Sequence, residues 1–244
     1  MILNGKEYNR QNLGKLFDYA LLSPDVTRDQ VKAHVERAIK YNVNAVHCNP
    51  YWLPMIADML EGTGIETGIV PSFPVGCDNT TMKVRQIEEY CKVLRGRPAC
   101  VDTGVNIGLL RGGELDEFTN DLREIVKVGH SHGYVVKSIL ETTFLSDEQI
   151  ATGTRCAVEA GVDVVKAASG RSGTADLRVM NIVKQNIPDL SKVKMKFSAL
   201  GTLSVTEQTI MGLVIGCTMF GTGYAHQIIE EMETYYKDLV ITTK

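Results

Sequence analysis

Three charged residues interrupt apolar segments where they could do chemistry. Lys166 ends a β-branched run in VDVVKAASGRSG (162–173) and is followed directly by small residues and glycines. Lys196 lies late in the apolar run VKMKFSALG, and Asp102 lies within ACVDTGVNIG. Charged side chains are rarely buried without a partner, so these residues are the first candidates for a functional site.

A lysine beside another lysine can become a nucleophile. If both amines enter one cavity of low dielectric constant, repulsion and lost hydration lower the lysine pKa from its reference of about 10.4. Lowering it to about 7 takes ~4 to 5 kcal/mol. A neutral lysine amine attacks an aldehyde or ketone and forms a carbinolamine, then a Schiff base. Protons must move at the same carbon, so a carboxylate is expected nearby, and Asp102 is the candidate.

Eight apolar runs recur at the spacing of strand–helix units. They predict strands at 15–22, 43–49, 65–73, 98–107, 134–140, 162–168, 193–199 and 216–222. With no Pro/Ser-rich linker between them, they favour an α/β fold, a (β/α)8 TIM barrel that forms a single domain over residues 1–244. A doubly wound open sheet is the alternative, but the first run is not followed by its usual G-x-G-x-x-G turn.

Helix starts are predicted between these strands by three capping boxes. They pair Thr27 with Gln30, Ser146 with Gln149 and Ser204 with Glu207. The helix that follows the first box shows one buried stripe, formed by Val31, His34, Val35 and Ala38.

In a TIM barrel the chemistry takes place at the C-terminal ends of the strands. Side chains alternate along a strand, so Lys166 shares a face with Val164, and Lys196 shares a face with Lys194. If that face is the barrel interior, Lys166 and Lys196 enter one space from neighbouring strands. A shift in register would make Lys194 the inward lysine instead.

Other interpretations of these charges stay open. A lysine and an aspartate inside a barrel can form a purely structural ion pair. Lys137 and Glu141, in VVKSILETTF, form either a charge pair behind the site or a pair that stabilises the barrel, and the second is favoured. His47, in AVHCNP, is interpreted as a polar residue that lines the site, because no second metal ligand has suitable spacing.

Composition favours a small molecule as the partner. The net charge is −3 and no segment gathers lysines and arginines, so nothing indicates nucleic acid or an anionic membrane surface. The first residues are too polar for a signal peptide, and no run approaches the ~18 apolar residues of a membrane span. Six cysteines without a CxxC spacing argue against zinc and disulfides, and favour a cytoplasmic location.

With these residues in view, the chain resembles the deoxyribose-phosphate aldolase family, class I aldolases with a TIM barrel. FDYALLSPD (17–25), NAVHCNP (44–50) and SFPVGCDNTTMK (72–83) are similar to motifs of its first strands. VDTGVNIG (101–108), VVKSILETTFLSDEQI and AVEAGVDVVKAASG match later family blocks in order. The resemblance covers nearly the whole chain.

The resemblance implies a role for each charged residue. Lys166 falls on the Schiff-base lysine, Lys196 on the lysine that lowers the pKa of the first, and Asp102 on the carboxylate that relays protons. Asp18 falls in the first-strand signature Asp-His-Thr, which reads Asp-Tyr-Ala here, and His47 replaces the usual cysteine. No metal or other cofactor is implied.

The phosphate-binding turns depart from the family pattern. Lys-Thr-Ser-Thr-Gly becomes Lys-Ala-Ala-Ser-Gly (166–170), a Gly-Gly-Ile-Arg-type turn becomes SALGTLS (198–204), and Gly-x-Ser-Ser becomes GTGY (221–224). Arg171 either supplies the missing charge or is only a solvated loop residue. Backbone N–H groups of such turns hold phosphate. The predicted substrate-binding residues are Asp18, His47, Ser169, Gly170, Arg171, Gly201, Gly221, Thr222 and Gly223.

The leading hypothesis is a reversible aldolase of deoxyribonucleotide catabolism. Lys166 would form a Schiff base with acetaldehyde, which cleavage of 2-deoxyribose 5-phosphate releases together with glyceraldehyde 3-phosphate. One alternative is a related Schiff-base aldolase or lyase with a different sugar or sugar phosphate, and another is a non-catalytic barrel that keeps the charges as a network. A sugar phosphate and an aldehyde are the expected partners, and a homodimer is an option, since members of this family commonly form one.

Overall fold

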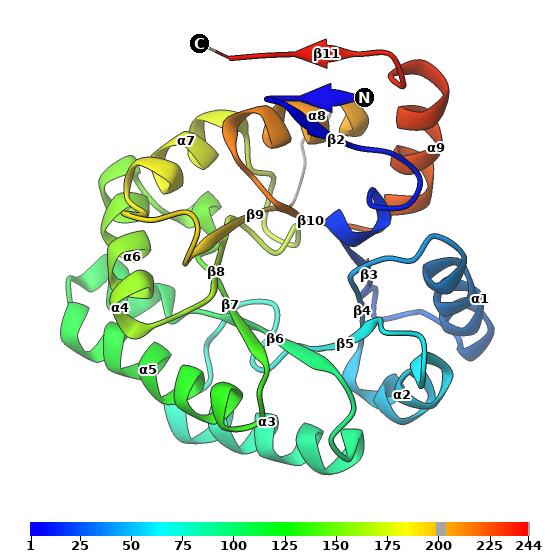
Figure 1. The fold of residues 1–244 in the computed structure, drawn as a ribbon. Coiled ribbons are helices and arrows are strands. Elements are labelled where there is room, and N and C mark those ends of the chain that lie inside the picture. Colours follow the sequence, from blue (N-terminus) through cyan, green and yellow to red (C-terminus); the bar gives the residue numbers. More distant parts are fainter. Residues whose placement is uncertain (199–203, 244) are drawn as a thin grey trace.

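The computed structural model describes residues 1–198 and 204–243. In this part of the chain, eight parallel strands close into a barrel in the order β10-β3-β4-β5-β6-β7-β8-β9, and helices surround it (Figure 1). The ring closes where β10 pairs with β3, and Gly221 lies opposite Asp18. The predicted (β/α)8 TIM barrel is confirmed, and the open-sheet alternative is excluded.

Each barrel strand lies within one of the eight predicted runs. Their bounds are β3 (Phe17–Leu21), β4 (Ala45–Cys48), β5 (Glu66–Ile69), β6 (Ala99–Gly104), β7 (Val135–Ile139), β8 (Val164–Lys166), β9 (Lys194–Ser198) and β10 (Met219–Thr222). The strands are shorter than the runs because the last apolar residues of several runs have left the ladder and begin the loops above the barrel.

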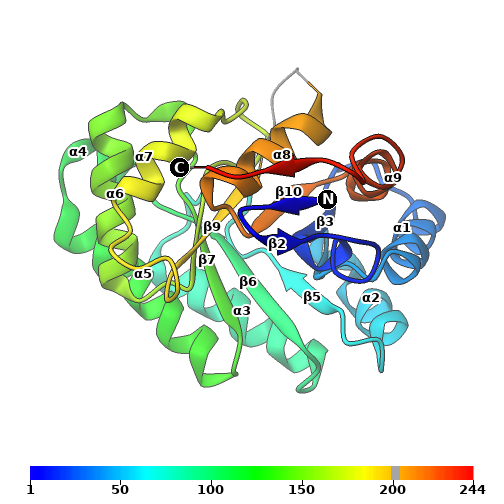
Figure 2. The ribbon, with the colours of Figure 1, turned by 45° about the horizontal axis from the view of Figure 1, so that its top comes forward.

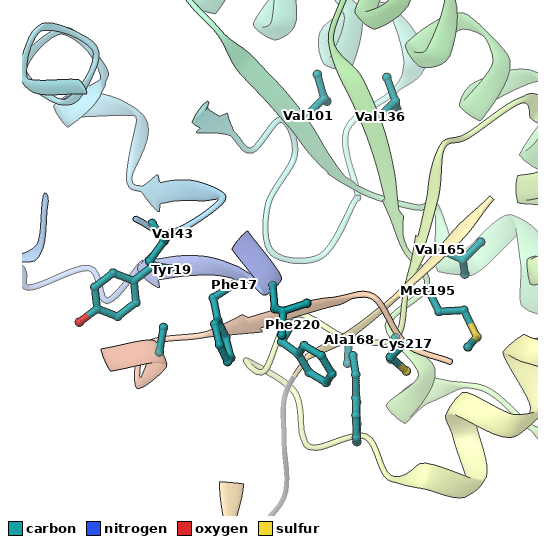
Figure 3. Packing of buried hydrophobic residues seen from close by; sticks show 14 of the residues in the cluster. Phe17, Tyr19, Val43, Val101, Val136, Val165, Ala168, Met195, Cys217 and Phe220 are labelled. Carbon is teal, nitrogen blue, oxygen red and sulfur yellow. The ribbon is translucent and has the colours of Figure 1, made fainter. Parts of the chain in front are cut away.

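Alternation of side chains along the strands separates the apolar core from the site. Figure 3 shows Val101, Val165 and Met195, which are fully buried in the hydrophobic cluster between the barrel and its helices. Their sequence neighbours Asp102 and Lys166 therefore face the barrel interior. The predicted inward direction of Lys166 is confirmed.

The helices follow the strands as the sequence predicts. They are α1 (Arg28–Lys40), α2 (Leu53–Leu60), α3 (Thr80–Leu94), α4 (Ile107–Gly112), α5 (Leu115–Ser131), α6 (Asp147–Ala160), α7 (Leu177–Gln185), α8 (Val205–Ile215) and α9 (Ala225–Tyr235). The predicted stripe on α1 is buried. Complete capping boxes begin α1 and α6, and at α8 the Ser204 side chain accepts a hydrogen bond from the Glu207 N–H.

A small sheet outside the barrel was not predicted. It consists of β1 (Ile2–Leu3), β2 (Lys6–Glu7) and β11 (Val240–Ile241), with β1 in the middle (Figure 2). Two-residue strands show no periodicity, so sequence patterns could not reveal them. The sheet brings the two ends of the described chain together. No helix in the described ranges is long and apolar enough to cross a membrane.

Candidate active site

The three charged residues picked out from the sequence meet inside the barrel. β8 and β9 pair so that Lys166 lies opposite Lys196, and Asp102 comes from β6. Lys166 Nζ donates a hydrogen bond to Asp102 Oδ2 at 2.9 Å, and Lys196 Nζ donates to the same oxygen at 2.7 Å. The side chain of Lys166 is 8% exposed and that of Asp102 is 0% exposed. Two amines therefore share one buried carboxylate oxygen.

A second aspartate extends this network across the barrel. Asp18 Oδ2 accepts hydrogen bonds from Lys137 Nζ and from Lys196 Nζ, each at 2.5 Å, and Asn44 donates to Oδ1 at 2.8 Å. Lys137 Nζ also lies 3.4 Å from Asp102 Oδ1. Lys196 thus bridges the two aspartates, and Lys137 holds them from the other side.

One prediction about lysines is wrong, and the alternative register that made Lys194 the inward lysine is excluded. Lys137 binds Asp18 rather than Glu141, which lies beyond the end of β7 with a left-handed φ of 53° and accepts hydrogen bonds from the N–H of Ser169. The turn at the end of the strand separates the two side chains. Lys194, the first residue of β9, is exposed, so the inward lysine of that strand is Lys196.

Burial and neighbouring charges shift the pKa values of the groups in this network, and so determine which of them are ionised. Burial and the adjacent Lys196 lower the pKa of Lys166 to about 8, although Asp102 acts in the opposite direction. Burial raises the pKa of Asp18 and Asp102, but the lysines outweigh it and hold the pKa of each below its usual range. About one molecule in ten then carries a neutral Lys166 at pH 7, against about one in 2,500 for an unperturbed lysine.

Lys166 and Lys196 line a cavity of about 550 Å³ at the C-terminal ends of the strands. Its volume suits a small organic ligand. Asp102 lies behind the lysines, fully buried. Other predicted binding residues that line this cavity are Asp18, His47, Ser169, Gly170, Arg171, Gly221, Thr222 and Gly223. Gly201, the remaining predicted residue, lies outside the described residues.

Gly221 provides the room that Lys196 needs. A Cβ atom at position 221 would lie 3.0 Å from Lys196 Cε and 3.0 Å from Ser198 Cβ. A larger residue would therefore press on the stem of Lys196, which would have to shift by a few tenths of an ångström. Gly221 thus leaves room for the charge network, apart from any contact with a substrate.

Sequence reasoning missed two features of the site. Lys137 belongs to the charge network. The sequence feature that marked Lys166, a lysine within an apolar strand, is present at Lys137 as well. Tyr224 lies at the mouth of the cavity and is 58% exposed. The sequence marked the turn GTGY (221–224) that contains Tyr224, but not the tyrosine itself, because a single exposed tyrosine in a loop is ordinary.

The barrel also brings together three side chains that could hold a metal ion. His47, Cys100 and Asp102 offer ligand atoms within 4.8 Å of one another. Lys137 Nζ, however, lies 3.2 Å from Cys100 Sγ and 3.4 Å from Asp102 Oδ1. Burial raises the pKa of the Cys100 thiol well above its usual value, so it stays protonated. A fixed ammonium group and a protonated thiol make these residues a poor fit for a metal ion.

Replacing Lys137 should destabilise the protein. In Lys137→Met, Asp18 keeps Lys196 but loses one of its two lysine partners inside the barrel, and breaking a buried pair costs about 3–5 kcal/mol. Urea unfolding measures the loss. Lys92→Met, which removes an exposed ion pair with Glu89, is the control and should unfold close to the wild type. A Lys137→Met midpoint equal to that of the control would contradict the prediction.

Fold and site together define a class, the TIM-barrel lyases with a buried lysine as nucleophile. The chain belongs to the deoxyribose-phosphate aldolase family. It is 33% identical over 228 residues to deoxyribose-phosphate aldolase from Aciduliprofundum boonei, covering 91% of this chain and 98% of that one. It is 31% identical over 228 residues to the enzyme from Caldanaerobacter subterraneus subsp. tengcongensis, covering 93% and 96%. No protein-family model matches the chain.

Solved structures share the fold. Deoxyribose phosphate aldolase from Aeropyrum pernix, described as a unique tetramer, superposes with a TM-score of 0.81 at 22% identity and covers 93% of each chain. An aldolase named QR15 superposes with a TM-score of 0.82 at 24% identity, covering 92% of this chain and 97% of that one. Identities this low support the barrel fold and nothing finer.

Proposed function

We propose that this protein is a class I aldolase that cleaves 2-deoxyribose 5-phosphate to acetaldehyde and glyceraldehyde 3-phosphate, and catalyses the reverse addition. The observation that carries the proposal is the Lys166 amine, which lies in a cavity with its pKa lowered to about 8 by burial and by Lys196. The relatives named deoxyribose-phosphate aldolase support the substrate.

Lys166 supplies the covalent step of this mechanism. Its neutral amine attacks C1 of the open-chain sugar, and loss of water from the carbinolamine leaves an iminium ion. The iminium nitrogen accepts the electrons of the C2–C3 bond, so an enamine forms as C3 becomes the aldehyde of the departing fragment. Protonation at C2 and hydrolysis then release acetaldehyde and the free lysine.

Asp102 and Lys196 support this step from behind. Asp102 is positioned to relay protons at the carbinolamine and enamine stages, through a water molecule, because its Oδ2 lies 2.9 Å from Lys166 Nζ. Lys196 keeps positive charge beside Lys166 and so favours the neutral amine. The sequence predicted these roles, and the distances support them.

The phosphate group is expected at the turns after β8 and β10. Gly170 has a left-handed φ of 80°, and the turn at Gly221–Gly223 leads into the N-terminus of α9, where backbone N–H groups favour an anion. Arg171 lines the same cavity and offers a positive charge beside the altered turn at 166–170. We therefore assign the phosphate to Arg171.

Arg171→Leu should raise KM for 2-deoxyribose 5-phosphate at least about tenfold, because a hydrogen bond to a charged group contributes about 1.5–3 kcal/mol. KM for unphosphorylated 2-deoxyribose should not change. Steady-state kinetics with both sugars measure the difference, and Arg155→Leu, on the exposed side of α6, is the control. Equal changes for the two sugars would show that Arg171 does not bind phosphate.

A second candidate is a Schiff-base aldolase with another acceptor. The altered turns at 166–170 and 221–224 favour this candidate. The same kinetics decide between the two, when extended to other sugar phosphates. Higher kcat/KM for a different sugar phosphate than for 2-deoxyribose 5-phosphate would select the second candidate.

The homodimer and the cytoplasmic location remain predictions. The tetramer formed by the Aeropyrum pernix relative supports self-association of this chain, whose copy number sedimentation equilibrium would measure.

A further inference from the structure

A buried carboxyl group, that of Glu141, holds the turn that follows Lys166. The N–H of Ser169 donates to Glu141 Oε2 at 3.1 Å and to Oε1 at 3.3 Å. The Thr143 hydroxyl donates to Oε1 at 3.4 Å. Glu141 is 1% exposed and forms no ion pair with any residue that the structure describes. Its carboxyl group therefore serves this turn.

The position of Glu141 has two energetic costs. Its φ of 53° lies in the left-handed region, which is unfavourable for a residue with a side chain. Burial of a carboxyl group without a cation is unfavourable as well. Such costs are typical of functional sites. Glu141 is not among the described residues that line the cavity, so it acts through the turn that it holds.

The segment 141–143 contacts the loop after Lys166 at two places. One is the hydrogen bond to Ser169. The other is Gly173, where a Cβ atom would lie 2.8 Å from Thr143 Cγ2. Between these two places lies Arg171, whose N–H donates to Ser169 Oγ at 3.0 Å. The residue assigned to the phosphate is therefore held on both sides by one segment.

Lys166 is held by other contacts. The N–H of Leu140 donates to the Lys166 carbonyl oxygen at 3.0 Å, and the N–H of Ala167 donates to the Lys196 carbonyl oxygen at 3.3 Å. These backbone bonds continue the pairing of β8 with β7 and β9, and none of them involves the Glu141 side chain. Loss of the carboxyl group should thus move the turn and leave the Lys166 amine in place.

We propose that Glu141 is a positioning residue for the phosphate of the substrate. By binding the Ser169 N–H, it holds the loop so that Arg171 lines the cavity. The proposal rests on the aldolase function proposed above, and it adds a residue that sets the affinity for the phosphorylated sugar without touching it.

Steady-state kinetics of Glu141→Ala with two sugars test this role. KM for 2-deoxyribose 5-phosphate should rise about tenfold, the scale of one hydrogen bond to a charged group, and kcat should stay within about threefold of the wild type. KM for unphosphorylated 2-deoxyribose should not change. Glu36→Ala, which removes an exposed glutamate of α1, is the control and should match the wild type.

Glu141→Gln tests the contact itself. Glutamine keeps an oxygen that can accept from the Ser169 N–H, and its amide group can donate to the Thr143 hydroxyl. This variant should therefore retain the wild-type KM for both sugars. A Glu141→Gln variant as impaired as Glu141→Ala would overturn the proposal.

The double variant shows whether Glu141 acts through Arg171. In the Arg171→Leu background, Glu141→Ala should raise KM for 2-deoxyribose 5-phosphate by less than about twofold more, since the group that the turn positions is already absent. Two losses that multiply would mean that the residues act independently, which contradicts the assigned role.

Trapping with acetaldehyde separates positioning of the phosphate from support of the whole site. Acetaldehyde carries no phosphate, so borohydride should trap Lys166 in Glu141→Ala at the wild-type rate. Loss of trapping in this variant, or equal rises in KM for the two sugars, would reduce Glu141 to a structural residue and refute the proposal.

Failure of the underlying function would give a different result. If Lys166 of the wild type were not trapped, the protein would not be a Schiff-base aldolase. If Arg171→Leu changed KM equally for both sugars, the phosphate would not bind at Arg171. Both measurements are made without a Glu141 variant, so either failure is distinguishable from failure of the positioning role.

Discussion

Lys166→Met should abolish cleavage, with kcat falling at least about 10⁴-fold, which is the scale on which loss of a covalent nucleophile is felt. Methionine matches the length of the lysine stem but offers no amine, so no carbinolamine can form. Asp102 keeps Lys196 as a partner at 2.7 Å, so the charge network remains largely paired and the barrel should fold.

Mass spectrometry after borohydride reduction with acetaldehyde shows where the Schiff base forms. The wild type should gain the mass of an ethyl group on the peptide that contains Lys166, and Lys166→Met should gain none. Lys194→Met, which removes an exposed lysine from β9, is the control and should be labelled like the wild type. An unmodified Lys166 peptide in the wild type would instead support the non-catalytic barrel.

Much of the fold could be predicted because parallel strands buried on both faces appear in the sequence as nearly continuous apolar runs. The alternation of side chains then placed Lys166 and Lys196 on the inward face, and neighbouring strands put them side by side. The triad with Asp102 could also be predicted, since charged residues at the C-terminal ends of barrel strands face one cavity.

What could not be predicted are the contacts across the barrel. Lys137 and Asp18 are 119 residues apart, and their pairing depends on the tilt of strands that are not neighbours. Glu141 looked the better partner because it lies only four residues from Lys137 in the sequence. A spacing of four residues brings side chains together on a helix, but not at the end of a strand.

The position of His47 could not be predicted for a similar reason. No spacing in the sequence connects it with Asp102, and only closure of the barrel brings His47 Nε2 within 3.2 Å of Asp102 Oδ1. Gly68 appeared to be an ordinary glycine, although its missing side chain leaves the space that the imidazole fills. A role that depends on an absent atom cannot be recognised from the residue alone.

Lys196→Met should lower kcat/KM at pH 7 by up to about 250-fold and move the rise of activity to higher pH. The charge of Lys196 lowers the pKa of Lys166, and the two share Asp102 Oδ2. Without Lys196 both effects raise the pKa of Lys166, while burial still lowers it. The neutral fraction at pH 7 therefore falls from about one in ten toward a limit of about one in 2,500, the value at the reference pKa of about 10.4.

The pH dependence of kcat/KM and of trapping shows whether Lys196 acts only through its charge or also transfers protons. If its charge only keeps Lys166 neutral, raising the pH deprotonates Lys166 in the variant, and kcat/KM and the rate of borohydride trapping should both recover between about pH 9 and pH 10. If Lys196 also donates protons to the substrate, trapping recovers but cleavage does not. An unchanged profile with a wild-type rate would mean that burial alone lowers the pKa of Lys166, and that the second lysine serves only to hold the two aspartates together.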